Sequence, residues 1–347
     1  QSAFRNIIIN GDMSLAQRAT STSSITSAGY YTIDRFNTVN TTLGTWTQSQ
    51  STDVPSGQGF ATSLKMDCTT ADASPAAGDQ LRIQQLIEGQ NLQYLKKGTS
   101  SAESTTLSFW VKSNKTGTYI AELFDNDNGR TISKSYTISS ANTWEKKSVT
   151  FPGDTSGALG NDNATSLLCN LWLGGGSNYT SGTLSTTWTS RSNVNRAVGQ
   201  VNLADSTSNE WYVTGVQLEA GTSASDFEFL PFDVNLARCQ RYFFLMCRGD
   251  QLDVGAGGYY NSGQIFCEVP LPVTMRTTPS LVATSGTNYY RMFGNNTNDP
   301  FDTIILGGGQ STLMQVFQTT GISGTTGVAG WLRTNNASAS VAAESEL

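Results

Sequence analysis

Tyrosine pairs in two stretches rich in glycine and asparagine are the side chains best suited to binding a ligand. The stretches GAGGYYNSG (255–263) and GTNYYRMFGNNTND (286–299) contain Tyr259, Tyr260, Tyr289, Tyr290 and Arg291. A sugar ring packs its C–H face on an aromatic ring, while nearby polar groups bond its hydroxyls. We therefore expect these residues to bind glycan. Packing between subunits and anchoring of the loops are the structural alternatives.

A second group of glycan candidates lies in a polar, loop-like part of the chain and consists of Asn178, Tyr179 and Trp188. Trp172 belongs to the polar face of its alternating segment, so we expect it to point outward. Tryptophans in other alternating segments are expected in the core: Trp110, Trp144 and Trp211.

Catalytic chemistry is limited because the chain contains no histidine. This excludes the Ser-His-Asp and Cys-His mechanisms, HExxH zinc sites and a histidine general base. The carboxylate pairs Asp125/Asp127 and Glu344/Glu346 are close only in sequence, in an expected turn and an expected tail. FDNDNGR (124–130) departs from the EF-hand spacing and indicates a hairpin turn. We expect a protein that is not an enzyme.

Net charge and the distribution of apolar residues indicate which kinds of partner the protein does not bind. The net charge is −6 and no basic patch stands out, which argues against nucleic acid. No apolar run approaches the roughly 20 residues of a membrane span, so no membrane insertion is expected. The first ten residues lack the apolar stretch of a secretory signal. Five cysteines without CxxC spacing indicate buried thiols in a protein assembled in a reducing compartment.

Strict alternation of apolar and polar residues predicts strands. TLSFWVKS (106–113) places Leu107, Phe109 and Val111 on one face, and TSLLCNLWLGGG (165–176) repeats the pattern before its glycines end the strand. Such segments, separated by Gly and Asn turns, are typical of an antiparallel two-sheet sandwich. Pro231 marks a boundary. We predict an all-β chain with a jelly-roll sandwich over residues 1–232, a smaller β-sandwich over 233–334 and a flexible tail over 335–347.

Five motifs then occur in order along residues 4–281. They are FRNIIINGDMSLAQRATS (4–21), YYTIDRFN (30–37), GVQLEAGTSASDFEF (215–229), LARCQRYF (236–243) and VPLPVTMRTTPSL (269–281). Together they resemble the motifs of bacteriophage tail-fibre and virion appendage proteins. The chain departs from the usual family pattern at Met13, Ala19 and Phe36.

This resemblance implies a carbohydrate-binding-module-like jelly roll followed by a distal β-domain, in a tail fibre or spike on the virion. The family is commonly trimeric, so a homotrimer attached to other virion proteins and binding a host surface glycan is expected, after assembly in the bacterial cytoplasm. Jelly-roll modules often hold a structural Ca²⁺, for which Asp12 and Glu219 are the matching acidic positions. No other cofactor is expected. A head fibre or capsid decoration protein and a polysaccharide depolymerase spike are the alternative functions.

Overall fold

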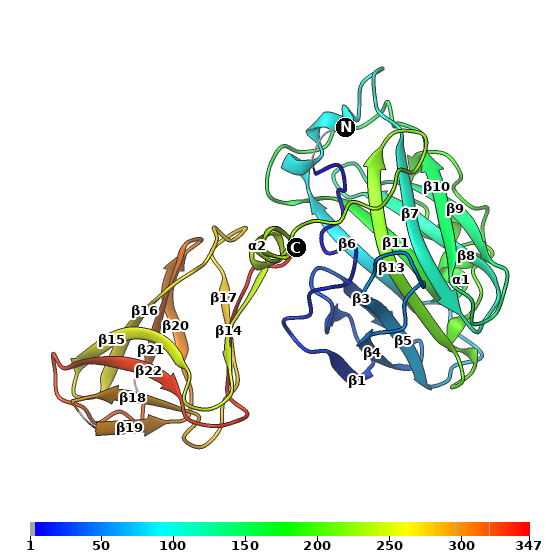
Figure 1. The fold of residues 1–347 in the computed structure, drawn as a ribbon. Helices are drawn as coiled ribbons and strands as arrows, with labels where there is room; N and C mark the ends of the chain where they lie inside the picture. The colour runs from blue at the N-terminus through cyan, green and yellow to red at the C-terminus, as the bar shows by residue number, and fades with distance from the viewer. Residues whose placement is uncertain (1–3, 296, 319) are drawn as a thin grey trace. The chain divides into compact units, whose positions relative to one another are not determined.

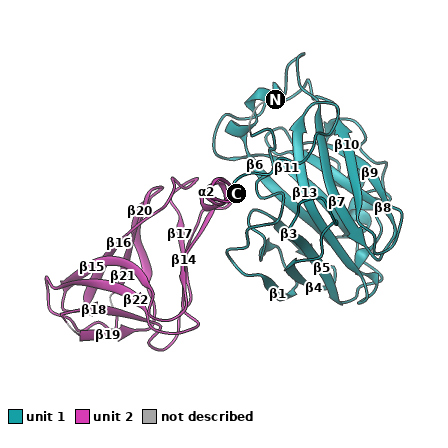
Figure 2. Cartoon of the chain, in the orientation of Figure 1, with its two compact units in different colours: residues 1–231, 347 teal, residues 232–346 magenta. Residues whose placement is uncertain are grey.

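The computed structural model describes residues 4–295, 297–318 and 320–347, and it divides the chain into two compact units (Figure 2). Unit 1 comprises residues 1–231 with Leu347, and unit 2 comprises residues 232–346. The division falls one residue before the expected boundary. Each unit is built from antiparallel sheets, which confirms the predicted all-β class: a jelly-roll sandwich followed by a smaller β-sandwich.

Unit 1 is a sandwich of two sheets (Figure 1). Sheet A has the order β1 (Ser21–Ile25), β4 (Thr45–Ser51), β5 (Ser63–Thr70), β13 (Glu210–Ala220), β7 (Thr105–Ser113) and β10 (Glu145–Phe151). Sheet B has the order β12 (Thr189–Ser190), β9 (Arg130–Ile138), β8 (Gly117–Asp125), β11 (Thr165–Gly175), β6 (Gln80–Glu88), β3 (Asn37–Thr41) and β2 (Gly29–Tyr30). The short helix α1 (Ser177–Thr180) and the 3-10 turns η1 (Gly89–Asn91), η2 (Gln93–Leu95), η3 (Asn193–Asn195) and η4 (Leu203–Asp205) lie in the connections.

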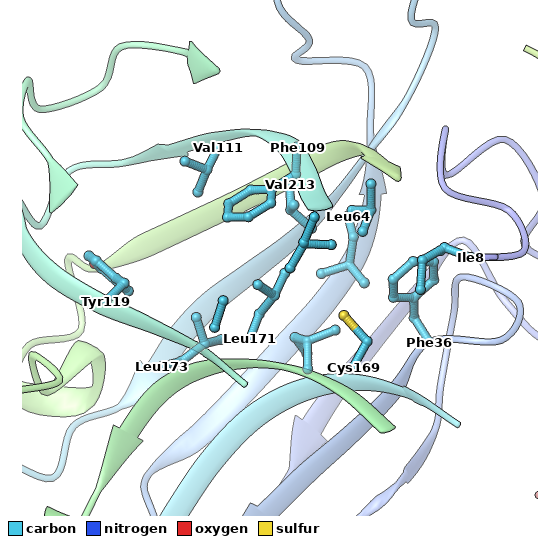
Figure 3. Packing of buried hydrophobic residues seen from close by; sticks show 14 of the residues in the cluster. Ile8, Phe36, Leu64, Phe109, Val111, Tyr119, Cys169, Leu171, Leu173 and Val213 are labelled. Atoms are coloured by element: carbon cyan, nitrogen blue, oxygen red, sulfur yellow. The ribbon is translucent and has the colours of Figure 1, made fainter. Parts of the chain in front are cut away.

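The core of unit 1 fills the space between sheets A and B. Phe109 and Val213 from sheet A and Leu171 and Leu173 from sheet B are fully buried and point toward one another (Figure 3). Burying each such side chain contributes roughly 1.5–3 kcal/mol. Alternation therefore leaves the intervening residues of these strands on the outer faces of the two sheets.

Unit 2 begins with α2 (Phe232–Gln240), which leads into the first strand of this unit. Sheet C has the order β14 (Phe243–Arg248), β23 (Ser340–Glu344) and β17 (Ser280–Ala283). Sheet D has the order β19 (Thr297–Phe301), β18 (Tyr290–Gly294), β22 (Ala329–Thr334), β15 (Asp253–Asn261), β16 (Gln264–Pro270), β21 (Leu313–Gln318) and β20 (Ile305–Gln310). Cys267, Met292 and Leu332 of sheet D and Val341 of sheet C share one buried core.

The prediction of a flexible tail over residues 335–347 is wrong. Residues 340–344 form β23, the central strand of sheet C, which pairs with β14 on one side and β17 on the other. Val341 and Ala343 are fully buried. Backbone hydrogen bonds to strands on both sides hold this segment in place. Small apolar side chains are therefore sufficient, although the Ala/Ser-rich composition by itself suggests a flexible tail.

Five cysteines are buried and form no disulfide, as the sequence predicts: Cys68, Cys169, Cys239, Cys247 and Cys267. Over the part of the chain that the structure describes, no helix combines the length and apolar character of a transmembrane segment.

Candidate functional site

The outer face of sheet A carries Trp110, which the sequence analysis predicts to be a core residue. Alternation along β7 turns Phe109 inward, so Trp110 faces outward and is only half-buried. Lys146 of β10 pairs with Trp110 on one side, and Thr214 of β13 pairs with it on the other. The expectation that Trp110 is a core residue is therefore wrong.

A pocket of about 160 Å³ opens beside Trp110. It is lined by Gln58, Phe60, Ser108, Trp110, Lys146, Gly215, Asp226, Phe227 and Phe229. Three phenylalanine rings form one wall: the ring centroids of Phe60 and Phe227 are 5.1 Å apart and those of Phe227 and Phe229 are 4.8 Å apart, both edge to face. Phe229 remains 49% exposed, so the wall presents aromatic surface to solvent.

The wall depends on a glycine in β13. At Gly215 the β13–β7 register shifts and φ is +62°, a backbone conformation that glycine adopts without strain. A Cβ at this position would lie 2.6 Å from the Phe60 ring. Gly215 therefore leaves the space that the tip of the Phe60 ring occupies.

Glu219 holds the segment that supplies Asp226 and Phe227. Its carboxylate accepts hydrogen bonds from the Ser225 backbone N–H at 2.8 Å and the Ser225 hydroxyl at 2.7 Å, and from Gln217 Nε2 at 2.9 Å. Arg5 Nη2 donates to the Asp226 carbonyl at 2.6 Å. Burial alone would raise the pKa of Glu219, but the bonds from Ser225 and Gln217 and the charge of Arg5 hold that pKa below its ordinary value.

The calcium position implied by the resemblance has other partners in this fold. Glu219 is occupied by Ser225, Gln217 and Arg5, and Asp12 accepts a hydrogen bond from the Ser14 hydroxyl at 3.1 Å. Across residues 4–295, 297–318 and 320–347, no group of three or more Asp, Glu, Cys or His side chains gathers in a way that could hold a metal ion.

Polar side chains around the pocket are free to meet a ligand. Within the described ranges, the side chains of Gln58, Ser108, Lys146 and Asp226 form no hydrogen bond or ion pair, and neither does Trp110 Nε1. The remaining lysines are engaged: Lys134 donates to the Thr186 carbonyl, and six pair with carboxylates. The lysine without a partner in the described structure is thus the one that lines the aromatic pocket.

Beyond the pocket, sheet A carries a second cluster, in which Trp144, Lys112 and Asp53 form hydrogen bonds and an ion pair with one another. Trp144 Nε1 donates to Asp53 Oδ1 at 2.9 Å, Lys112 pairs with Asp53, and the Lys112 ammonium lies 4.3 Å from the centroid of the Tyr212 ring. Burial raises the pKa of Asp53, but the bonds from Lys112 and Trp144 outweigh it and lower the pKa overall. Trp144 is half-buried on this outer face, so its prediction as a core residue is also wrong, whereas Trp211 is fully buried as predicted.

Residues 176–201, which we call the strap, include the edge strand β12 and otherwise cover part of the outer face of sheet B. Ala197 of the strap forms a buried cluster with Ile120 and Trp172. Trp172 does lie on the outer face, as the sequence predicts, but it is fully buried because the strap covers it.

A buried ion pair fastens the strap. Arg196 bonds Glu122 through two nitrogens at 2.7 and 3.0 Å, and Trp172 Nε1 and Asn170 Nδ2 donate to the same carboxylate at 2.9 and 3.0 Å. Burial raises the pKa of Glu122, but the nearby Arg196 and Arg82 and these bonds lower it overall. The buried carboxylate is thus paired with a cation and hydrogen-bonded, as a buried charge requires.

The strap also contains the three glycan candidates predicted in unit 1. Asn178 and Tyr179 are adjacent, whereas Trp188 has a different set of partners. Asn178 is exposed, and the Tyr179 ring centroid lies 5.4 Å from that of Trp172. Trp188 has different partners: its Nε1 donates to the Pro152 carbonyl at 2.8 Å, and the Lys97 ammonium lies 5.0 Å from its ring centroid.

Lys97 joins the FDNDNGR turn to a neighbouring loop. Its ammonium pairs with Asp125, lies 3.0 Å from Asp154 Oδ2 and donates to the Gly157 carbonyl at 2.9 Å. Asp125 also accepts hydrogen bonds from Asn128. The turn connects β8 and β9, as predicted, and the Lys97 ammonium pairs with its buried carboxylate.

In unit 2 the predicted residues divide between core and surface. Tyr290 is fully buried with its hydroxyl 2.6 Å from the Thr284 carbonyl, and Tyr259 is 7% exposed with its hydroxyl 3.2 Å from Asp299. Burial and the neighbouring Asp299 raise the pKa of Tyr259 to about 12. Both tyrosines are core residues, so they lack the exposed ring that the glycan prediction assumed.

The other three residues of that prediction are more accessible. Tyr260 is 71% exposed, and Tyr289 and Arg291 are half-buried. The sequence analysis missed Trp331, which is 51% exposed beside Phe293 on the outer face of sheet D. The alternation of AGWLRT (329–334) is the signal that separates Trp331 from the buried Leu332. Whether any of these residues binds glycan stays a prediction.

No model of a known protein family matches the chain, and no curated protein matches it. Solved structures similar to it include a domain of bacteriophage CBA120 tailspike protein 4, described as enzymatically active, at 17% identity and a TM-score of 0.33. That match covers 63% of this chain and 22% of the tailspike chain, so this chain spans less than a quarter of that structure.

Carbohydrate-binding modules are also among the similar structures. The family 11 module from Clostridium thermocellum, solved with a β-1,3-1,4-mixed-linked tetrasaccharide, has 10% identity and a TM-score of 0.27 over 59% of this chain and 98% of its own. The xylan-binding domain from Paenibacillus barcinonensis has 10% identity and a TM-score of 0.26 over 60% of this chain and 93% of its own. At these scores the assignment of the fold rests on the strand order described above.

Proposed function

We propose that this chain is a non-catalytic adhesion protein of a bacteriophage virion, a tail fibre or spike that binds glycan on the host surface. The observation that carries the proposal is the pocket on sheet A. It combines the exposed aromatic surface of Trp110 and Phe229 with the free polar groups of Lys146 and Asp226. Aromatic faces with a few convergent polar groups are what a sugar ligand requires.

The residues of the phage-like motifs support the same proposal because they build this pocket. Arg5 belongs to the first motif, while Gln217 and Glu219 belong to the motif at the end of unit 1. Their hydrogen bonds hold Ser225 and Asp226 in place. The resemblance and the pocket therefore depend on the same side chains.

The proposed assembly is a homotrimer attached to other virion proteins on a tail or other appendage. Trp331 and Ile305 of unit 2 are 51% and 46% exposed, and packing between subunits would cover such apolar surface. Several copies of a weak sugar site on one particle raise the effective concentration, so modest single contacts suffice for adhesion.

The absence of catalysis is part of the proposal. Among the described residues that line the pocket, Asp226 alone carries a carboxylate. Glycoside hydrolysis ordinarily uses two carboxyl groups about 5–9.5 Å apart. This favours adhesion over the depolymerase alternative, and no observation favours a head fibre or capsid decoration protein.

Binding of the purified full chain to an array of bacterial surface polysaccharides tests the proposal. We expect binding to at least one glycan, competition by the same glycan in solution, and no release of reducing ends on long incubation. Failure to bind any member of the array would contradict adhesion, and release of reducing ends would replace it with the depolymerase.

A further inference from the structure

We infer that the pocket on sheet A binds one neutral pyranose residue at the end or at a branch of a glycan. The sugar ring stacks on Trp110, and two neighbouring hydroxyls bond Lys146 and Asp226. This inference rests on the proposed function and names the ligand class of its site.

The dimensions of the pocket favour a single ring. Its volume is about 160 Å³, below the roughly 300–1,000 Å³ of sites that enclose drug-sized ligands. The rings of Phe60, Phe227 and Phe229 line one side of the pocket. Trp110 lines it from the outer face of sheet A. A pyranose can therefore place one apolar face on Trp110 with its edge toward the phenylalanines.

The sheet is closed to a longer chain in both directions along β7. Toward one end, Lys112 is paired with Asp53 and packed on Tyr212. Toward the other end, Thr106 is fully buried, with its hydroxyl 2.9 Å from the Gly221 carbonyl. A glycan that runs along β7 must therefore leave the sheet on either side of the bound residue, as it does at a chain end or a branch.

The charges at the pocket favour a neutral sugar. An ammonium only donates hydrogen bonds and a carboxylate only accepts them, whereas a sugar hydroxyl does both. Lys146 and Asp226 are both exposed, and no ion pair joins them within the described ranges, so each is available to one of two adjacent hydroxyls. An acidic sugar that pairs with Lys146 brings its carboxylate into the same small pocket as Asp226, and an amino sugar that pairs with Asp226 brings its ammonium into the same pocket as Lys146. A neutral sugar meets neither repulsion, and its hydroxyls can bond both groups.

The test is a titration of the full chain, followed by tryptophan fluorescence and saturation-transfer NMR. The probes are methyl glycosides of glucose, galactose, mannose, N-acetylglucosamine, glucuronic acid and glucosamine. We expect a neutral glycoside to bind best and its affinity to change less than about threefold in the matching tetrasaccharide. Trp110→Ala, Lys146→Met and Asp226→Asn should each weaken binding about tenfold or more.

Matched variants make the result decisive. Lys134→Met removes another lysine of unit 1 and should leave the affinity unchanged, and Trp110→Phe keeps an aromatic ring should Trp110→Ala fold poorly. Binding that survives Lys146→Met and Asp226→Asn, and Trp110→Ala where that variant folds, but disappears in Tyr260→Ala overturns the pocket and leaves adhesion standing. Stronger binding of a charged sugar, or affinity that rises more than about tenfold with chain length, overturns the ligand class. Absence of binding to any glycan on the array overturns the proposed function as well.

Discussion

The backbone N–H of Asn6 donates a hydrogen bond of 2.9 Å to the carboxylate of Glu228, which lies 222 residues later in the chain. Asn6 also bonds β13 from its side chain, as a donor to the Val216 carbonyl at 3.1 Å and an acceptor from the Leu218 N–H at 3.1 Å. One asparagine thus ties the first segment of unit 1 to its last. Because Asp226, Phe227 and Phe229 line the pocket on sheet A, the hydrogen bonds of Asn6 to Glu228 and β13 help to position them.

Replacing Glu219 by Gln should destabilise unit 1 by about 1–3 kcal/mol at neutral pH, because charge-assisted bonds to Ser225 weaken. The pKa of Glu219 is lowered in the folded state, against an unfolded value of about 4.3. Its contribution is therefore complete above that unfolded value and is lost as the pH falls through the folded one. Urea unfolding from pH 7 to pH 3 should show the two proteins converging at low pH. The control is Glu103→Gln, an exposed acid paired with Lys96. A difference that is constant across this range would contradict the prediction.

Gly215→Ala should cost more than Gly57→Ala, although both glycines have positive φ, +62° and +73°. Each substitution incurs a backbone penalty of about 1–2 kcal/mol. Only at Gly215 does the new Cβ meet a neighbour, the Phe60 ring, since nothing lies within 4 Å at Gly57. Thermal unfolding should separate the two variants, and the aromatic NMR signals of Phe60 should move in Gly215→Ala alone. Equal losses of stability in the two variants would mean that the Phe60 ring can move aside at no cost.

The adjacent lysines Lys96 and Lys97 provide a sharp comparison. The Lys97 side chain is 7% exposed and faces Asp125 and Asp154, which are 0% and 3% exposed. Lys97→Met leaves buried carboxylates without this cation and should cost about 3 kcal/mol or more. Lys96 forms a surface pair with Glu103, so Lys96→Met should change stability by less than about 1 kcal/mol. Chemical denaturation of both variants checks this, and similar costs would refute the assigned burial.

Glu122→Ala should release the strap over sheet B. The substitution leaves the Arg196 guanidinium buried without its carboxylate, at a cost of about 3–5 kcal/mol. Hydrogen exchange should accelerate in residues 176–201 before it does in the strands of sheet A. Glu103→Gln again serves as the control. Unchanged protection of the strap would show that other contacts hold it.

Alternation predicts which residues of a strand share a face, and this explains why Phe109 and Val111 lie in the core as the sequence predicts. It does not tell which distant segment covers the other face. Trp110 and Trp172 both lie on outer faces, yet residues 225–229 leave Trp110 open while the strap buries Trp172. The pocket therefore could not be found from the local pattern. The same holds for β23, whose short alanine-rich sequence becomes a strand through its pairing with two remote partners.

The position of β23 between β14 and β17 has a consequence for biosynthesis. A ribosome releases the chain in order, so sheet C stays incomplete until residue 344 has left the exit tunnel. Sheet A needs only the chain up to Ala220, where β13 ends. At roughly 5–20 residues per second, unit 1 gains a head start on the order of ten seconds. During that interval the nascent β14 and β17 have exposed edges, and a cellular chaperone that shields strand edges would act on unit 2.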